Sequence, residues 1–211
     1  MEKIFERPTP EEKFMDLWNA YIARRPGAQP LMTWLRSNEF FEAPASTHYH
    51  GAYPGGLCEH SLNVAINALL MRQIPAFNDV SEQEAVTAAL LHDVCKVGIY
   101  RRDKAGIYRH EDDRVLGHGA ASVILIRQYM QLTEAEQVAI LWHMGLYGDP
   151  DKAQTLGRAY NLYPLAMLIH HADMMATYYC DGEKEWAWYE AAGGNERAGK
   201  DIGVRSRKEK Q

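Results

Sequence analysis

The sequence predicts an all-α fold, a single-domain helical bundle, and three observations support this prediction. Apolar residues recur at helical spacing through most of the chain. With 211 residues and 46% apolar content, the chain is long enough for one domain with a substantial core and short for two. Capping-box pairs stand before three of the helical segments: Thr9 with Glu12, Ser81 with Glu84, and Thr133 with Glu136.

The N-terminal residues 1–45 are expected to form helices that pack on the core. Thr9 caps the first of these helices, which we expect to end near Pro26. A shorter helix is predicted from Pro30 to Arg36. The segment from Phe40 to Gly56 is rich in proline, glycine and histidine, which indicates an ordered loop.

Five further helices are predicted, and a small β-hairpin is allowed between Ile99 and His110, where β-favouring runs flank Lys104 to Gly106. The long polar stretch from Gly145 to Asn161 is expected to be a loop, and its length suggests a binding role. Glycines and charges from Gly193 to Gln211 predict a flexible tail. The first of the five helices covers Leu57 to Arg72. The second is opened by Ser81, contains His92 and Asp93, and is expected to stop at Gly98. The other three cover Gly119 to Met130, Glu134 to Met144, and a last segment opened by Pro164.

Composition excludes several classes of partner and points to a cytoplasmic protein. The net charge of -5 gives no general attraction for nucleic acid or an anionic membrane. The longest apolar runs, such as Ala85 to Leu91, are far shorter than a membrane span, and residues 1–10 are charged rather than signal-like. Three cysteines, an odd number without zinc-type spacing, are expected to be reduced core thiols: Cys58, Cys95 and Cys180.

Four histidines and two aspartates form the candidate metal site: His60, His92, Asp93, His118, His143 and Asp173. Any one histidine on a partly apolar helix is more often a packed, hydrogen-bonded residue than a ligand. However, burying all six separately would be expensive, whereas one shared site satisfies them together. Spacings of 32, 25, 25 and 30 residues place successive members on different helices, so the site would be built across the bundle.

Imidazole and carboxylate ligands without a thiolate suit Mn, Fe, Co, Ni or Zn better than Ca or Mg. Six ligands exceed the need of one four-coordinate ion, whereas two ions about 3.5 to 4 Å apart could share Asp93 as a bridge. A water between two such ions would be acidified towards hydroxide, which suits attack on a phosphoester. The first ion is assigned His60, His92, Asp93 and Asp173, and the second is assigned Asp93, His118 and His143.

Five stretches of the chain resemble the HD superfamily of metal-dependent phosphohydrolases, over roughly Tyr49 to Tyr178. They are YPGGLCEHSLNV, ALLHDVCK, GHGAASVI, AILWHMG and IHHADMMATY. The resemblance implies an all-helical, metal-binding catalytic domain, placed at residues 46–192, and the same ligand roles. His118 and His143 are similar to the extra positions that accompany a second metal in one branch of the family.

Two narrower resemblances bear on the substrate. The segment HYHGAYPGGL is similar to part of the HD domain of bacterial 3'-to-5' exoribonucleases, but the roughly 45 preceding residues are too few for the nucleic-acid-binding domain of those enzymes. Cyclic-dinucleotide phosphodiesterases of the family carry a glycine-tyrosine-proline signature after the paired histidines. The run here is WHMGLYGDP, so that activity is not expected.

Three residues are candidate contacts to substrate. Lys96 shares a predicted helical face with His92 and Asp93 and could bind a phosphate, or it could be a solvated lysine at a helix end. Loop residue His50 and His170, on the face of Asp173, are the other two candidates, either of which could serve only as a hydrogen-bonding residue. The basic segment Ile99 to His110 is read as either a phosphate-facing lid or an ordinary charged surface.

The sequence therefore predicts a metal-dependent phosphohydrolase that acts on a small phosphorylated substrate, with a nucleotide as the expected one. Asp93 and Lys96 are its predicted catalytic residues. Two alternatives stay open: a phosphodiesterase or nuclease acting on short oligonucleotides, and a non-catalytic module that binds metal and nucleotide in regulation.

Overall fold

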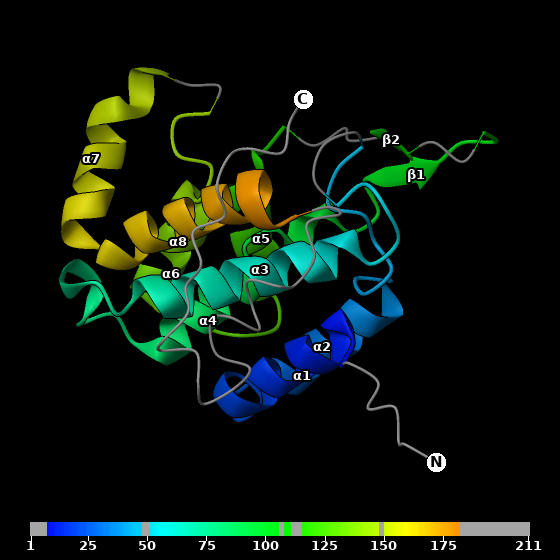
Figure 1. Cartoon of the computed structure of the whole chain (residues 1–211), viewed down its shortest axis with the longest axis horizontal. Coiled ribbons are helices and arrows are strands. Elements are labelled where there is room, and N and C mark those ends of the chain that lie inside the picture. Colours follow the sequence, from blue (N-terminus) through cyan, green and yellow to red (C-terminus); the bar gives the residue numbers. More distant parts are fainter. Residues whose placement is uncertain (1–7, 48–50, 106–107, 111–114, 148–149, 182–211) are drawn as a thin grey trace, which may run out of the picture.

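The computed structural model describes residues 8–47, 51–105, 108–110, 115–147 and 150–181. This part of the chain is helical, with one two-stranded hairpin after Asp93, so the predicted all-α fold is confirmed (Figure 1). The α-helices are α1 (Pro10–Tyr21), α2 (Ala28–Ser37), α3 (Gly56–Met71), α4 (Glu82–Leu91), α5 (His118–Arg127), α6 (Glu134–Trp142), α7 (Ala153–Leu162) and α8 (Pro164–Met175). The shorter elements are η1 (Pro75–Phe77), η2 (Val94–Lys96), β1 (Tyr100–Arg102), β2 (Tyr108–His110), η3 (Pro150–Lys152) and the π-helical turn η4 (Ala176–Cys180).

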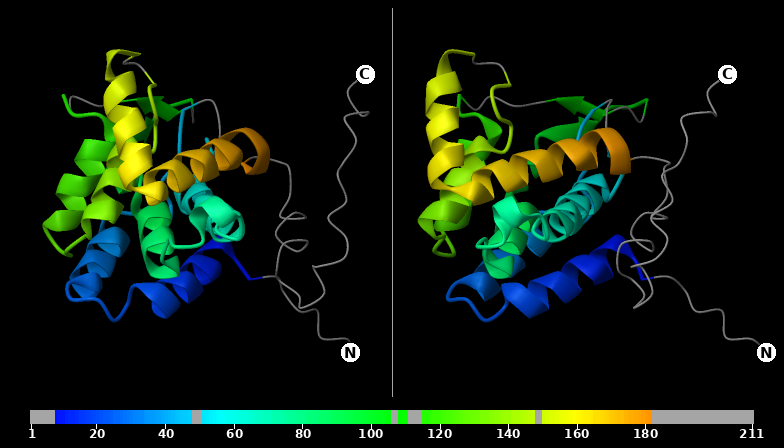
Figure 2. Two further views of the ribbon diagram at one scale, coloured as in Figure 1. Left: turned by 90° about the vertical axis from the view of Figure 1, so that its left-hand side faces the viewer. Right: turned by 60° about the vertical axis from the view of Figure 1, so that its left-hand side comes forward.

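Helix α3 is the centre of the bundle. It lies between α8 on one side and the N-terminal helix α1 on the other, as two viewing directions show (Figures 1 and 2). Helix α4 packs on α3, α6 and α8, and α5 packs on α6. Most residues of α3 are buried in this way, so its buried polar residues must find partners inside the bundle.

The N-terminal helices share the core of the rest of the chain. Phe14 and Trp18 of α1 and Leu31 of α2 belong to the same buried cluster as residues of α3, α4, α6 and α8. Arg25 ties them to α6: its guanidinium donates to the carboxylate of Glu136, with an Nη2 to Oε2 distance of 2.8 Å. These contacts join the N-terminal helices to the shared core. The division at residue 45 stays a prediction, and the tail at 193–211 lies outside the described residues.

Two of the three predicted capping boxes form, and the third is wrong. Thr9 and Thr133 each accept a hydrogen bond from the backbone N–H three residues later and receive the reciprocal glutamate contact. Ser81 occupies the N-cap position of α4 but makes no such side-chain bond. Glu84 instead accepts a hydrogen bond from the Thr133 hydroxyl at 2.7 Å, so this carboxylate joins two helices instead of closing its own box.

The predicted loop from Gly145 to Asn161 is wrong for much of its length, because η3 and α7 occupy residues 150–162. The glycine and the polar residues of this segment suggested a loop, yet Leu156 and Ala159 are buried on one face of α7. This face packs against α8. Gly157 is tolerated inside the helix, where a side chain would meet open space.

The described residues include no helix long and apolar enough to cross a membrane. Three cysteines are buried and form no disulfide in the part of the chain that the structure describes, in keeping with their predicted role as core thiols: Cys58, Cys95 and Cys180.

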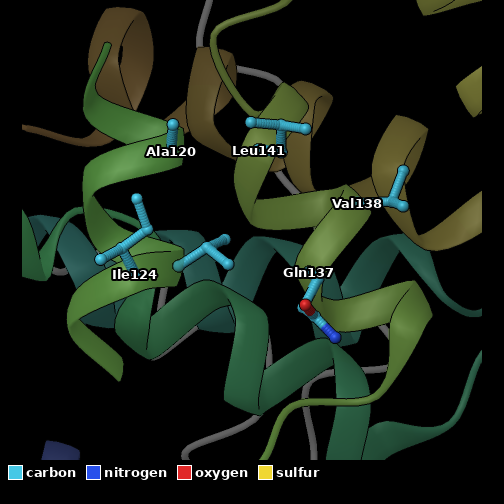
Figure 3. A pocket seen from close by; sticks show the side chains of 6 residues that line it. Ala120, Ile124, Gln137, Val138 and Leu141 are labelled. Atoms are coloured by element: carbon cyan, nitrogen blue, oxygen red, sulfur yellow. The ribbon is translucent and has the colours of Figure 1, made fainter. Parts of the chain in front are cut away.

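Helices α5 and α6 approach each other closely at Gly119, and they leave a shallow hollow on their outer surface (Figure 3). A Cβ atom at Gly119 would lie 2.5 Å from the carbonyl oxygen of Leu141. The hollow contains none of the predicted site residues. Its lining consists of Ala120, Val123, Ile124, Gln137, Val138 and Leu141.

Replacing Gly119 with alanine is expected to lower the free energy of unfolding by about 1–3 kcal/mol, because the backbones of α5 and α6 must separate. Gly157→Ala is the matched control. It adds a methyl group in open space within a helix and is expected to raise the same free energy by about 0.5–1 kcal/mol. Urea denaturation followed by circular dichroism measures both, and equal effects of the two substitutions would contradict the close approach.

Candidate metal centre

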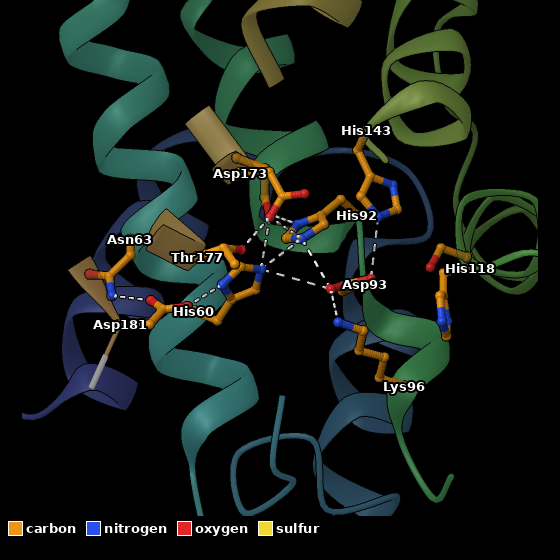
Figure 4. A network of polar contacts seen from close by, with 12 residues as sticks. His60, Asn63, His92, Asp93, Lys96, His118, His143, Asp173, Thr177 and Asp181 are labelled. Carbon is orange, nitrogen blue, oxygen red and sulfur yellow. Dashed lines mark hydrogen bonds and ion pairs between the residues drawn. The ribbon is translucent and has the colours of Figure 1, made fainter. Parts of the chain in front are cut away.

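Four helices bring five of the six predicted ligands to one place inside the bundle (Figure 4). The N-terminal part of α3 carries His60, and α8 carries Asp173 in its last turn. His92 and His143 are the C-cap residues of α4 and α6, and Asp93 follows directly on His92. All five side chains are buried, each residue being at most 3% exposed.

The residues predicted to hold the first ion converge closely. The Nε2 atom of His60 lies 3.2 Å from the Nε2 atom of His92 and 3.2 Å from Oδ1 of Asp173. Oδ2 of Asp93 lies 3.2 Å from the Nε2 atom of His92 and 3.8 Å from that of His60. Donor atoms held at about 2.1 Å around a tetrahedral ion are themselves about 3.4 Å apart, so these separations fit one cation.

His143 faces the opposite oxygen of Asp93. The distance from its Nε2 atom to Oδ1 of Asp93 is 3.4 Å, and among the described residues neither atom has a hydrogen-bonding partner. Buried polar atoms are almost always satisfied, so two such atoms facing each other indicate a missing electrophilic partner. Asp93 thus presents one oxygen to His60 and His92 and the other to His143, which is the arrangement that a bridging carboxylate needs.

The tautomers of two histidines are set by the helices that carry them. Nδ1 of His92 lies 2.7 Å from the carbonyl oxygen of Ala89, and Nδ1 of His143 lies 2.7 Å from that of Ile140. Because a carbonyl oxygen can only accept, each Nδ1 must carry the hydrogen. The Nε2 lone pairs of both rings are therefore available to a cation in the cluster.

The charges in the cluster favour a cation at its centre. Burial would raise the pKa of Asp93, but the Lys96 ammonium and His92 hold it well below the ordinary value of an aspartate. Burial would lower the pKa of His60, but the carboxylates of Asp181 and Asp173 outweigh that effect and raise it to about 10. The lowered pKa values of Asp93 and Asp173 keep both carboxylates ionised, and the surroundings of His60 attract positive charge.

Lys96 is buried and ion-paired. Its Nζ atom lies 2.7 Å from Oδ2 of Asp93, and the residue is 7% exposed, so the alternative of a solvated lysine is wrong. The helical face that it was expected to share with His92 does not form either, because α4 ends at Leu91 and the 3₁₀ turn η2 follows. Gly98 adopts a left-handed conformation with φ of 77° and ends this irregular segment.

His118, the sixth predicted ligand, does not join the converging group. It is the first residue of α5 and lies beside the cluster, with its Nδ1 atom 3.7 Å from Sγ of Cys95 (Figure 4). The candidate ligand groups of the described residues contain the other five residues only. A metal-binding role for His118 therefore stays a prediction that requires its side chain to turn towards Asp93.

The two remaining candidate substrate contacts differ in what the structure says of them. His50 lies outside the described residues. Nδ1 of His170 donates a hydrogen bond to the carbonyl oxygen of His143 at 2.6 Å, so His170 contacts the backbone of a predicted ligand. Cε1 of the His170 ring lies 2.6 Å from the position that a Cβ atom of Gly145 would occupy. Contact between His170 and a substrate stays a prediction.

Sequence reasoning missed three polar residues around the cluster. Oδ2 of Asp181 lies 2.7 Å from Nδ1 of His60, and Oδ1 of Asp181 accepts a hydrogen bond from the side-chain amide of Asn63 at 2.8 Å. Thr177 donates to Oδ1 of Asp173 at 3.4 Å. Asp181 is separated from His60 by 121 positions and belongs to no local motif, so no pattern along the chain indicates this contact.

Comparisons with known proteins agree with the predicted resemblance. The family model for the HD domain matches residues 57–178. A dihydroneopterin 2',3'-cyclic phosphate phosphodiesterase from Methanocaldococcus jannaschii is 38% identical over 80 residues. These residues are 36% of this chain and 32% of the archaeal enzyme, so the match spans about a third of the length of that relative. No solved structure matches the chain significantly.

If the cluster binds a divalent cation, metal must stabilise the fold. At a free metal concentration 100-fold above the dissociation constant, the expected gain in the free energy of unfolding is about 2.7 kcal/mol, and a chelator should remove it. Urea denaturation with manganese or zinc, compared with a chelator, measures this gain. His92→Ala should reduce the gain, because it removes a ligand of the first ion, whereas the exposed His171→Ala should retain the gain in full. Equal gains in both variants would place the bound metal elsewhere.

Proposed function

Because this chain belongs to the HD domain family, we propose that it is a metal-dependent phosphohydrolase acting on a small phosphorylated substrate, most simply a nucleotide. The observation that carries the proposal is the convergence of three imidazoles and two carboxylates, all buried, at the meeting point of α3, α4, α6 and α8. The family match covers all six predicted ligands. The 46–192 catalytic unit remains part of this proposal.

The ligand assignment proposed from the sequence is retained. His60, His92, Asp93 and Asp173 would hold a first divalent ion, and Asp93, His118 and His143 a second, with Mn, Fe, Co, Ni or Zn as the candidate metals. When bound, such ions lower the pKa of a coordinated water and polarise a phosphoryl group. The orphaned atoms of Asp93 and His143 support the second position.

The residues of the chain would prepare the site in three ways. Asp93 stays ionised and offers its two oxygens to two sides of the cluster. The buried ammonium of Lys96, beside Asp93, adds a positive charge that would also attract a phosphate oxygen. Burial of the cluster excludes bulk water and so strengthens each of these interactions. His50 and His170 are retained as proposed substrate contacts.

The relative suggests a narrower substrate class. That protein is named for a phosphodiesterase activity on a 2',3'-cyclic phosphate, a small phosphorylated compound with a strained phosphodiester ring. We propose 2',3'-cyclic phosphates as one candidate substrate class for this chain, alongside nucleotide mono- and polyphosphates. The acidic chain gives no support to nucleic acid as a partner, and we propose a cytoplasmic location.

The substrate proposal is tested by a panel of mono-, di- and triphosphates, 2',3'-cyclic and 3',5'-cyclic nucleotides, and short RNA and DNA, each with added manganese, cobalt or zinc. Release of phosphate or opening of the cyclic ester supports a hydrolase acting on small substrates. If the release of mononucleotides from oligonucleotides is the only reaction seen, the nuclease alternative is supported. Tight binding without turnover would support the non-catalytic module.

Asp93→Asn is expected to reduce turnover by more than the 10- to 100-fold that is typical of residues that only support a ligand. It removes the charge that both proposed ions would share. Because Lys96 then loses its buried partner, the variant is also expected to lose stability, by up to about 3–5 kcal/mol. Circular dichroism at the assay temperature shows whether the variant is folded.

The exposed Asp79→Asn is the matched control and should keep full turnover and stability. If folded Asp93→Asn hydrolyses the best substrate of the panel at the wild-type rate, the proposed role of Asp93 is wrong.

His118→Ala tests the second ion. The wild-type protein is expected to bind two equivalents of metal, and the variant one, because only the second ion is assigned to His118. Elemental analysis after equilibrium dialysis counts the ions, and His171→Ala should still bind two. Two equivalents in His118→Ala, or a single equivalent in the wild-type protein, would contradict a second ion held by His118.

A further inference from the structure

The three imidazoles of the cluster differ in what holds the ring nitrogen that points away from it. For His92 and His143 that partner is a main-chain carbonyl three residues earlier. For His60 it is a side chain, the carboxylate of Asp181, at 2.7 Å. A carboxylate is the stronger acceptor, and a histidine that binds metal through Nε2 gains basicity and a fixed orientation from such a partner.

Asp181 is itself held in place on several sides. Its side chain is 2% exposed, and Oδ1 accepts a hydrogen bond from Asn63 of α3, one turn after His60. Its backbone N–H donates to the carbonyl oxygen of Ala176 at 2.9 Å, five residues earlier. Both oxygens therefore face α3, and neither is left to the solvent.

The π-helical turn η4 explains how Asp181 reaches this place. In η4 the backbone N–H groups bond to carbonyl oxygens five residues earlier, instead of four residues earlier as in α8. Each residue of η4 therefore turns the chain through a smaller angle about the helix axis. Since each residue of an α-helix advances the direction by about 100°, an ordinary continuation would aim residue 181 elsewhere. The same turn places Thr177 against Asp173, while Tyr178 and Tyr179 stay exposed.

We propose that Asp181 is a positioning residue of the metal site: it accepts the Nδ1 hydrogen of His60 and thereby directs the Nε2 lone pair of His60 into the cluster. Asn63 fixes the carboxylate in the required orientation. Asp181 lies three residues beyond the region that the family model matches. The inference rests on the proposed metal-dependent function.

The test compares metal affinity in the wild-type protein, Asp181→Asn and Asp181→Ala. Competition with a chromophoric chelator measures the dissociation constant for zinc or cobalt. Asp181→Ala is expected to weaken the tighter site 10- to 100-fold, as is typical of the partner of a metal-bound histidine. Asp181→Asn keeps an oxygen acceptor without the charge, so its loss should be clearly smaller. Asp79→Ala is the matched control and should bind as the wild-type protein does.

A second readout separates positioning from simple structural support. Nitrogen-15 NMR of the zinc-loaded protein reports which ring nitrogen of His60 carries the hydrogen. Nδ1 should carry it in the wild-type protein and in Asp181→Asn, with a mixed or reversed assignment in Asp181→Ala. If Asp181→Ala does not fold, the metal affinity of Asp181→Asn decides, since loss of the charge alone should still weaken binding.

The outcomes distinguish the two proposals. A wild-type protein that binds no divalent metal would overturn the proposed function, and this inference with it. A wild-type protein that binds metal, together with Asp181 variants of unchanged affinity and unchanged His60 tautomer, would overturn the role of Asp181 and leave the function standing.

Discussion

The burial of five ionisable side chains in one small volume is the constraint on which the rest of this structure depends. Two carboxylates and three imidazoles lie within the apolar core, where an uncompensated charge is very costly. Each has a partner outside the cluster: Asp93 has Lys96, His60 has Asp181, Asp173 has Thr177, and the other two histidines have main-chain carbonyls. The atoms that remain unsatisfied all point inward, which is why the cluster fits a cation better than a set of packed polar residues.

The sequence predicts the helical order and most of the cluster because the relevant signals are local. Capping boxes and apolar spacing locate the helices, and His92 and Asp93 sit at the end of one of them. Asp181 could not be predicted, since it meets His60 across 121 positions through a π-helical turn that has no reliable pattern. Helix α7 was missed because its glycine and polar residues outweigh the two buried positions that hold it to α8.

Prediction was also limited where a side chain has more than one possible partner. Glu84 has the spacing of a capping box, yet it bonds to Thr133 of another segment. His118 has the position of a ligand, yet its ring lies near Cys95. The N-terminal helices stand outside the matched family region, but Arg25 joins them to Glu136 at the start of α6, the helix that ends at His143. Such long-range pairings depend on tertiary packing and leave no trace in local spacing.

The conformation of His92 and His143 has a consequence for how such a chain can diverge. Both residues are C-caps with φ of -58° and ψ of -33°, and both are held by the carbonyl oxygen three residues earlier. Their directions are therefore set by the phase of α4 and α6. A single inserted or deleted residue in either helix would rotate the imidazole by about 100°, whereas substitutions on the outer faces would not. Related chains should thus vary in the composition of these two helices while preserving their length.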